Sequence, residues 1–113
     1  MKRDMDIIRR LLLEAEATNG PLNVRGNLET YQVGLMIDAG LIEGRISAEI
    51  GAVARQSYIH RLTWAGHDFL DASRDDGLWQ KAHDKILKPA GSWTFSILLE
   101  WLKDQIRQSL PNV

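Results

Sequence analysis

The chain of 113 residues is 44% hydrophobic and 26% charged, and its formal net charge is −1. This composition excludes a mainly disordered protein and the strongly basic character of many nucleic-acid-binding domains. The chain has no cysteine, which excludes disulfides, thiolate zinc sites and cysteine nucleophiles. We expect a cytoplasmic protein, because no apolar run approaches the ~18 residues of a membrane span and no secretory signal is evident.

The first predicted element is a helix over residues 3–18. Its apolar residues recur at three- and four-residue steps and form one stripe: Met5, Ile8, Leu11, Leu12 and Ala15. Asp4 and Asp6 suit the positive end of the helix dipole, and the run TNGP is a stop signal at the other end.

A short extended stretch over residues 22–28 and a second helix over residues 29–39 are expected next. Gly40 ends this helix, because glycine readily adopts the left-handed conformation that a helix terminus often requires. The outward positions of the helix are predicted to be Glu29, Thr30, Gln32, Val33 and Asp38.

A β-hairpin is predicted from the alternation in residues 56–62, which places Tyr58, His60 and Leu62 on one face. Its partner strand is residues 41–46 or 47–50, and residues 51–54 form the tip. Thr63 is a suitable N-cap for a third helix over residues 64–73.

Two further helices complete the chain. Asp75, Asp76 and Gly77 form a break before a helix over residues 78–88, and Ser92 caps a last helix over residues 93–110.

The order helix, short strand, helix, hairpin, helix predicts an α+β, winged-helix-like domain over residues 1–75. Residues 76–113 form a C-terminal helical extension that packs on this domain or on a second subunit. The segments MKRDMDIIRRLLLE, LMIDAGLIEG and IHRLTWAGHDFLDASRDDGLW resemble the domain-of-unknown-function family 2513, which comprises small, often phage- or prophage-associated bacterial proteins. The resemblance covers most of the chain through Trp79 and implies no particular activity. It leads us to expect a histidine near Gln32, and the chain departs from the family there.

Nothing in the sequence indicates catalysis or a cofactor. No nucleophile elbow, phosphate-binding loop, dinucleotide fingerprint or zinc-protease motif is present. His67 and Asp71 have the helical spacing of two metal ligands, but no third ligand accompanies them, and we interpret them as surface and packing residues. We therefore expect a non-enzymatic protein without a metal or cofactor.

Nucleic-acid binding is the first of two function classes that remain open. The hairpin arginines Arg45, Arg55 and Arg61 could contact phosphates, and Thr30 and Gln32 could read base edges. The helix over residues 29–39 contains no Lys or Arg and two acidic residues. We therefore expect any binding to double-stranded DNA to be weak and sensitive to salt.

Protein interaction is the second class, in which the chain acts as an adaptor. The last helix is predicted to be apolar on most of its sides, which is more apolar surface than one helix face buries. Its predicted interface residues are Trp93, Ile97, Leu98, Trp101 and Leu102. We expect a homodimer or another protein partner at this helix.

Overall fold

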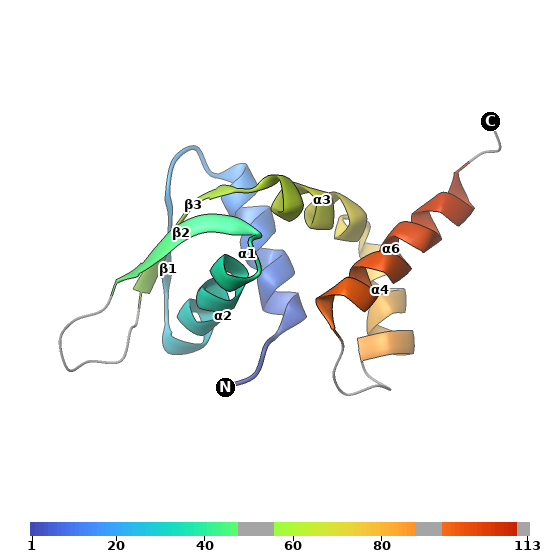
Figure 1. Ribbon diagram of the computed structural model, residues 1–113, viewed down its shortest axis with the longest axis horizontal. Coiled ribbons are helices and arrows are strands. Elements are labelled where there is room, and N and C mark those ends of the chain that lie inside the picture. Colours follow the sequence, from blue (N-terminus) through green and yellow to red (C-terminus); the bar gives the residue numbers. More distant parts are fainter. Residues whose placement is uncertain (48–55, 88–93, 111–113) are drawn as a thin grey trace. The chain divides into compact units, whose positions relative to one another are not determined.

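The computed structural model describes residues 1–47, 56–87 and 94–110 and combines helices with a three-stranded sheet (Figure 1). The elements are α1 (Met5–Ala17), β1 (Leu22–Arg25), α2 (Asn27–Asp38), β2 (Ile42–Ser47), β3 (Gln56–Leu62), α3 (Trp64–Ser73), α4 (Asp76–Ala82), the π-helical segment η1 (His83–Leu87) and α6 (Phe95–Ser109). The α+β class and the winged-helix-like order of elements agree with the prediction. The predicted hairpin tip at 51–54, Arg55, Ser92 and Trp93 lie outside the described residues.

The chain divides into two compact units, Met1–Asp68 and Phe69–Val113. The division falls within α3, ahead of residue 75 where the sequence suggested the end of the first domain. The three strands and helices α1 and α2 belong to the first unit.

Helix α1 forms as predicted. The Asp4 side chain accepts hydrogen bonds from the backbone N–H groups of Asp6 and Ile7, which occupies two donors that the first helical turn leaves free. Its buried residues are Met5, Ile8, Leu11 and Leu12. This stripe supplies the largest helical contribution to the core of the first unit.

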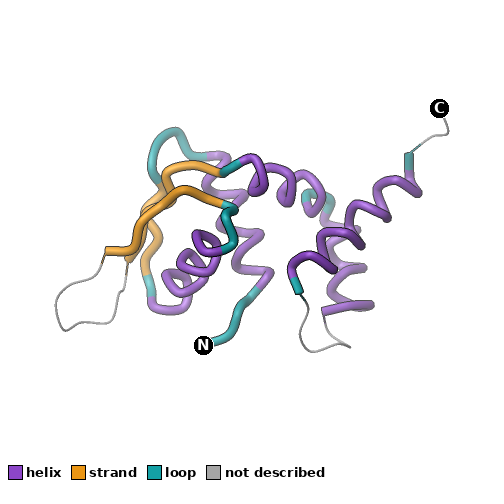
Figure 2. Tube along the Cα trace, in the orientation of Figure 1, coloured by secondary structure: helices purple, strands orange, loops and turns teal. Residues whose placement is uncertain are grey.

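The sheet is antiparallel with the strand order β1-β3-β2, so β3 lies in the middle (Figure 2). Val24, Ser57 and Ile59 are buried, whereas their neighbours Asn23 and Arg25 are exposed. Side chains alternate between the two faces of a strand. One face of the sheet therefore lies against α1 and α2, and the other face is open to solvent.

A register shift in the hairpin corrects the predicted alternation of β3. Ile59 pairs with Gly44 and Arg61 pairs with Glu43, so His60 is an extra residue opposite this step. Such a bulge lets two successive residues point outward. His60 and Arg61 are both exposed, and Leu62 is buried on the side of Ile59 rather than sharing a face with Tyr58 and His60.

Helix α2 begins at Asn27 rather than residue 29, because the chain turns sharply at Gly26, which has a φ of 105°. The predicted end at Gly40 is confirmed by its φ of 74°. The N–H of Gly40 donates to the carbonyl of Ile37, and the N–H of Leu41 donates to the carbonyl of Met36. These bonds occupy carbonyls that the last helical turn leaves free.

The predicted cap of α3 is also confirmed. The Thr63 hydroxyl accepts a hydrogen bond of 3.1 Å from the N–H of Gly66 and donates to the carbonyl of Gly40. A Cβ atom at Gly66 would collide with the carbonyl of Leu41, so only glycine permits this close approach. The start of α3 is thereby fixed to the turn that joins α2 to β2.

The second unit has an aromatic core. The Phe69 ring lies edge-on to the Trp79 ring, with 6.2 Å between centroids, and 5.0 Å from the Phe95 ring. Asp75 lies in the predicted break between two helices and is the N-cap of α4, where its side chain accepts a hydrogen bond from the N–H of Leu78, whereas Asp76 and Gly77 belong to α4. The predicted helix over 78–88 is thus α4 followed by η1. Thr94 caps α6, which starts at Phe95.

Candidate binding surfaces

The orientation of α2 differs from the prediction. Thr30, Gln32 and Val33 were expected to point outward, but they are 2%, 0% and 0% exposed. The prediction was wrong because the sequence pattern does not show which face of this helix is buried: Val33 is in the core, and two hydrogen bonds accompany the burial of Gln32. In this structure Thr30 and Gln32 are not positioned to read base edges.

Gln32 holds the N-terminal segment against α2. Its Oε1 accepts a hydrogen bond of 2.8 Å from the N–H of Asp4, and its Nε2 donates one of 2.8 Å to the carbonyl of Lys2. A buried amide needs such partners, since an unsatisfied one costs roughly 1–3 kcal/mol. The residue therefore links the N-cap of α1 to the middle of α2. No residue-level signal in the sequence indicates this pairing.

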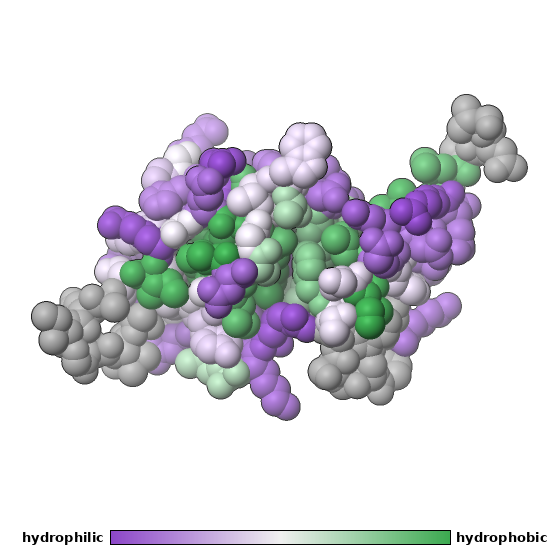
Figure 3. Space-filling model, viewed as in Figure 1, coloured by the Kyte–Doolittle hydropathy of each residue, from purple (hydrophilic) through white to green (hydrophobic). Residues whose placement is uncertain are grey.

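The exposed side of α2 carries large apolar side chains. Leu28 and Tyr31 lie three residues apart on one helical face and are 41% and 40% exposed. Ile46 of β2 is 40% exposed and lies over Gly34, the next position along that face, because a Cβ there would be 3.1 Å from the Ile46 Cδ1 atom. We call Leu28, Tyr31 and Ile46 the α2 patch. Figure 3 shows hydrophobic side chains at the surface beside the base of the hairpin.

Charge on α2 is acidic only. The helix contains Glu29 and Asp38 and no Lys or Arg. Glu29 is half-buried and lies 3.8 Å from the Arg10 guanidinium, whereas Asp38 is exposed. A surface of this kind repels phosphates and offers no cationic group to a nucleic acid.

The solvent-exposed face of the sheet carries two arginines, Arg25 of β1 and Arg45 of β2. Tyr58 on the central strand lies between Asn23 of β1 and Arg45 of β2 in the register, and Gln56 lies between Arg25 and Ser47. We call these six residues the outer sheet face. The Arg45 guanidinium carbon lies 4.9 Å from the centroid of the Tyr58 ring. Arg25 was not among the predicted binding residues, although its alternation with the apolar Val24 would have placed it on this face.

Of the three predicted phosphate-binding arginines, only Arg45 is described and free of ion pairing. Arg61 makes a two-point contact with Glu43, at 2.9 Å from Nε and 2.6 Å from Nη2. This cross-strand pair follows from the register of β2 and β3, which the sequence did not specify. Arg61 is therefore already neutralised, and Arg55 lies outside the described residues.

The predicted interface helix is amphipathic rather than apolar all round. Leu98 and Leu102 are 0% exposed, so they are core residues and not part of an outer surface. Ile97 is 55% exposed and Trp101 is half-buried, and they remain on the accessible side of α6. The prediction failed for the two leucines because one helix face is covered within the chain itself.

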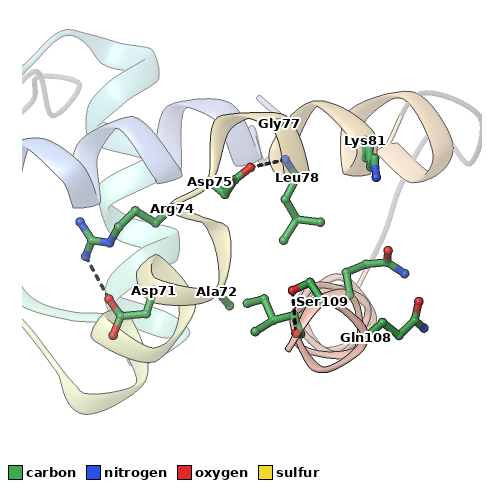
Figure 4. A pocket seen from close by; sticks show the side chains of 11 residues that line it. Asp71, Ala72, Arg74, Asp75, Gly77, Leu78, Lys81, Gln108 and Ser109 are labelled. Carbon is green, nitrogen blue, oxygen red and sulfur yellow. Dashed lines mark hydrogen bonds and ion pairs between the residues drawn. The ribbon is translucent and has the colours of Figure 1, made fainter. Parts of the chain in front are cut away.

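The second unit contains a groove of about 810 Å³ (Figure 4). Helix α6 contributes Gln105, Ile106, Gln108 and Ser109, and the α3–α4 region contributes Asp71, Ala72, Arg74, Asp75, Gly77, Leu78 and Lys81. Its charged groups are largely engaged, since Arg74 bonds Asp71 at 3.0 Å and Asp75 caps α4. The groove thus offers an apolar surface from Ala72, Leu78 and Ile106, together with the amides of Gln105 and Gln108.

The structure brings no metal-ligand set together in the part of the chain that it describes. His67 and Asp71 are both exposed, and Asp71 pairs with Arg74. No group of three His, Asp or Glu side chains that could hold a metal is found among residues 1–47, 56–87 and 94–110. In the same residues, no helix is long and apolar enough to cross a membrane.

The fold and its surfaces define a small α+β protein with an open sheet face and an apolar patch. Residues 2–92 match the sequence model of a family described as "Hypothetical protein (DUF2513)", and the chain belongs to this family. It is also similar to an uncharacterized protein of Haemophilus influenzae (strain Rd), with 37% identity over 99 residues that cover 76% of this chain and 79% of that protein. No solved structure matches the chain. The resemblance predicted from the sequence motifs is thereby confirmed.

Proposed function

We propose that this protein is a non-enzymatic, cytoplasmic, winged-helix-like binding module of the phage or prophage type, and that it acts as a protein-interaction or regulatory adaptor. The observation that carries the proposal is that helix α2 exposes Leu28 and Tyr31, although it buries the polar Thr30 and Gln32. Large apolar and aromatic side chains that remain exposed at a protein surface are typical anchors of protein interfaces.

The α2 patch suits a protein better than DNA. A helix that reads bases in the major groove needs polar or cationic side chains toward the base edges. On α2 the accessible side presents Leu28, Tyr31 and Asp38 instead. These groups favour an apolar partner surface with a cationic rim.

Self-association is a second contact within the same proposal. Ile97 and Trp101 lie four residues apart on α6 and keep accessible apolar surface. They are the residues of the predicted interface helix that could contact a second copy of the chain. DNA binding through the hairpin remains the alternative function, and Arg45 is the residue that favours it.

The proposal is tested by site-specific photo-crosslinking in the native host. A benzophenone amino acid replaces Tyr31 in one variant and the exposed Glu16 of α1 in the control. The Tyr31 variant is expected to crosslink to one defined protein, which the control does not capture. That protein is then purified and titrated against the wild type and against the variant Leu28→Ser/Tyr31→Ser.

The double substitution should weaken the complex at least tenfold, which corresponds to about 1.4 kcal/mol, while the melting temperature stays close to that of the wild type. Crosslinking equal to that of the Glu16 control would overturn the proposal. An affinity that is unchanged in the double variant would also overturn it.

A further inference from the structure

We propose that the outer sheet face binds the sugar–phosphate backbone of a nucleic acid without reading its sequence. This inference does not rest on the α2 patch, because a different set of residues on β1, β2 and β3 carries it. It also differs from the hairpin site expected from the sequence, since Arg25 replaces the neutralised Arg61.

The first observation is the charge of this face. Arg25 and Arg45 are exposed, and neither forms an ion pair with a described residue. Glu43, on the same side of β2, is balanced by its two-point contact with Arg61. The face therefore keeps two uncompensated guanidinium groups.

The second observation is the chemistry around these groups. In the register, Asn23 lies beside Tyr58, and Gln56 lies between Arg25 and Ser47, so neutral hydrogen-bonding side chains lie near the two cations. Arginine and such neutral donors are the side chains that commonly contact phosphate and sugar oxygens. A guanidinium also matches phosphate geometry with two parallel hydrogen bonds.

The third observation is the contact between Arg45 and the Tyr58 ring. The Arg45 guanidinium carbon lies 4.9 Å from the centroid of the Tyr58 ring, and this contact restricts the long side chain. This contact lowers the entropy that the side chain loses on binding an anion. It also covers one face of the ring, so a base is not expected to stack there. We therefore expect this face to contact the sugar–phosphate backbone rather than to stack on bases.

The spacing of the two cations fits a polymer. Strands lie about 4.8 Å apart and outward residues of one strand about 6.7 Å apart, which places the Cα atoms of Arg25 and Arg45 roughly 12 Å apart. Each of the two groups therefore suits a separate phosphate of a nucleic-acid backbone.

The test uses the full chain with a fluorescent 20-base-pair duplex and with the corresponding single strand, at ~50 mM salt and above, by anisotropy. Two phosphate contacts predict a slope of log affinity against log salt of about −1.8 for the duplex and about −1.4 for the single strand. Arg25→Gln/Arg45→Gln should weaken binding at least tenfold and bring the slope close to zero. The two nucleic-acid forms show which strand geometry the face prefers.

Two control variants separate this site from general electrostatics. Lys81→Gln/Arg107→Gln removes two exposed cations from the second unit, and Glu43→Gln/Arg61→Gln removes the ion pair without changing the net charge. Both should bind within about twofold of the wild type. NMR spectra of the backbone amides should confirm that every variant is folded. In the wild type, addition of the duplex should shift the amide signals of β1, β2 and β3.

Three results would overturn the proposal. One is a loss of nucleic-acid affinity in the Lys81→Gln/Arg107→Gln control that equals the loss in Arg25→Gln/Arg45→Gln. Another is tighter binding of polyglutamate than of either nucleic acid, which would assign the face to an acidic protein. The third is no binding by the wild type at about 100 µM, the weak end of the usual range for non-specific binding.

Discussion

Helices α2 and α6 differ in the kinds of side chain that they bury. Helix α6 buries Leu98 and Leu102, and its charged residues such as Glu100 and Asp104 are exposed. Helix α2 buries a threonine and a glutamine, and it exposes a leucine and a tyrosine. The buried face of α6 consists of leucines, whereas on α2 the hydrogen bonds of Gln32 add to the burial of Val33 and Met36. A helix that breaks the hydropathy rule in both directions is the place to look for a partner.

The strongest test of this contrast is Leu102→Ala in α6. Removal of a fully buried leucine leaves a cavity and should lower the free energy of unfolding by about 2–5 kcal/mol. The matched change Ile97→Ala, on the same helix but 55% exposed, should lower it by less than about 0.5 kcal/mol. Urea denaturation followed by circular dichroism measures both.

The same pair of variants also probes self-association. If α6 pairs with a second copy, Ile97→Ala shifts the mass measured by light scattering toward that of a monomer without loss of stability. Equal destabilisation by the two variants would show that the accessible side of α6 is part of the core.

A smaller effect is expected from Gln32→Ala in α2. The substitution leaves the N–H of Asp4 and the carbonyl of Lys2 without their partner and should cost about 1–3 kcal/mol. Gln80→Ala removes an exposed hydrogen bond to Asp84 and should cost less than about 0.5 kcal/mol. Hydrogen exchange at the Asp4 amide should accelerate only in the first variant. Unchanged exchange there would contradict the role of Gln32.

The smallest effect, and one of opposite sign, is expected from Thr30→Val. The buried Thr30 hydroxyl has no hydrogen-bond partner among the described residues, so its burial is uncompensated. Valine keeps the branched shape and should raise the free energy of unfolding by up to about 1 kcal/mol. Thr18→Val is the control, because the Thr18 hydroxyl donates a 2.7 Å bond to the carbonyl of Glu14. A loss of stability in Thr30→Val would mean that the hydroxyl has a partner.

Much of the fold could be predicted because it depends on local signals. The apolar stripe and Asp4 define α1, Gly40 ends α2, and Thr63 marks the start of α3. The sequence does not predict on which face of the sheet the β3 side chains after Ile59 lie, because a bulge depends on how two strands pair. The start of α2 was misplaced because the turn at Gly26 depends on a backbone angle that only glycine readily adopts.

The candidate sites were less accessible from sequence than the fold. Arg45 was found because it lies in an evident hairpin, and Arg61 was included for the same reason although Glu43 neutralises it. The α2 patch was missed because helical periodicity does not show which face a helix with scattered apolar residues buries. Both errors concern tertiary partners, which a pattern along one chain does not specify.

The bulge at His60 also determines how this chain tolerates changes in length. Loss of one residue from a regular strand inverts every side chain beyond it, which exchanges core and surface. His60 is the extra residue of its strand pair, so its removal would leave Ile59 and Leu62 buried and Arg61 outward, as they are now. At this point of the hairpin, the in-frame loss of a single codon is therefore compatible with the same core.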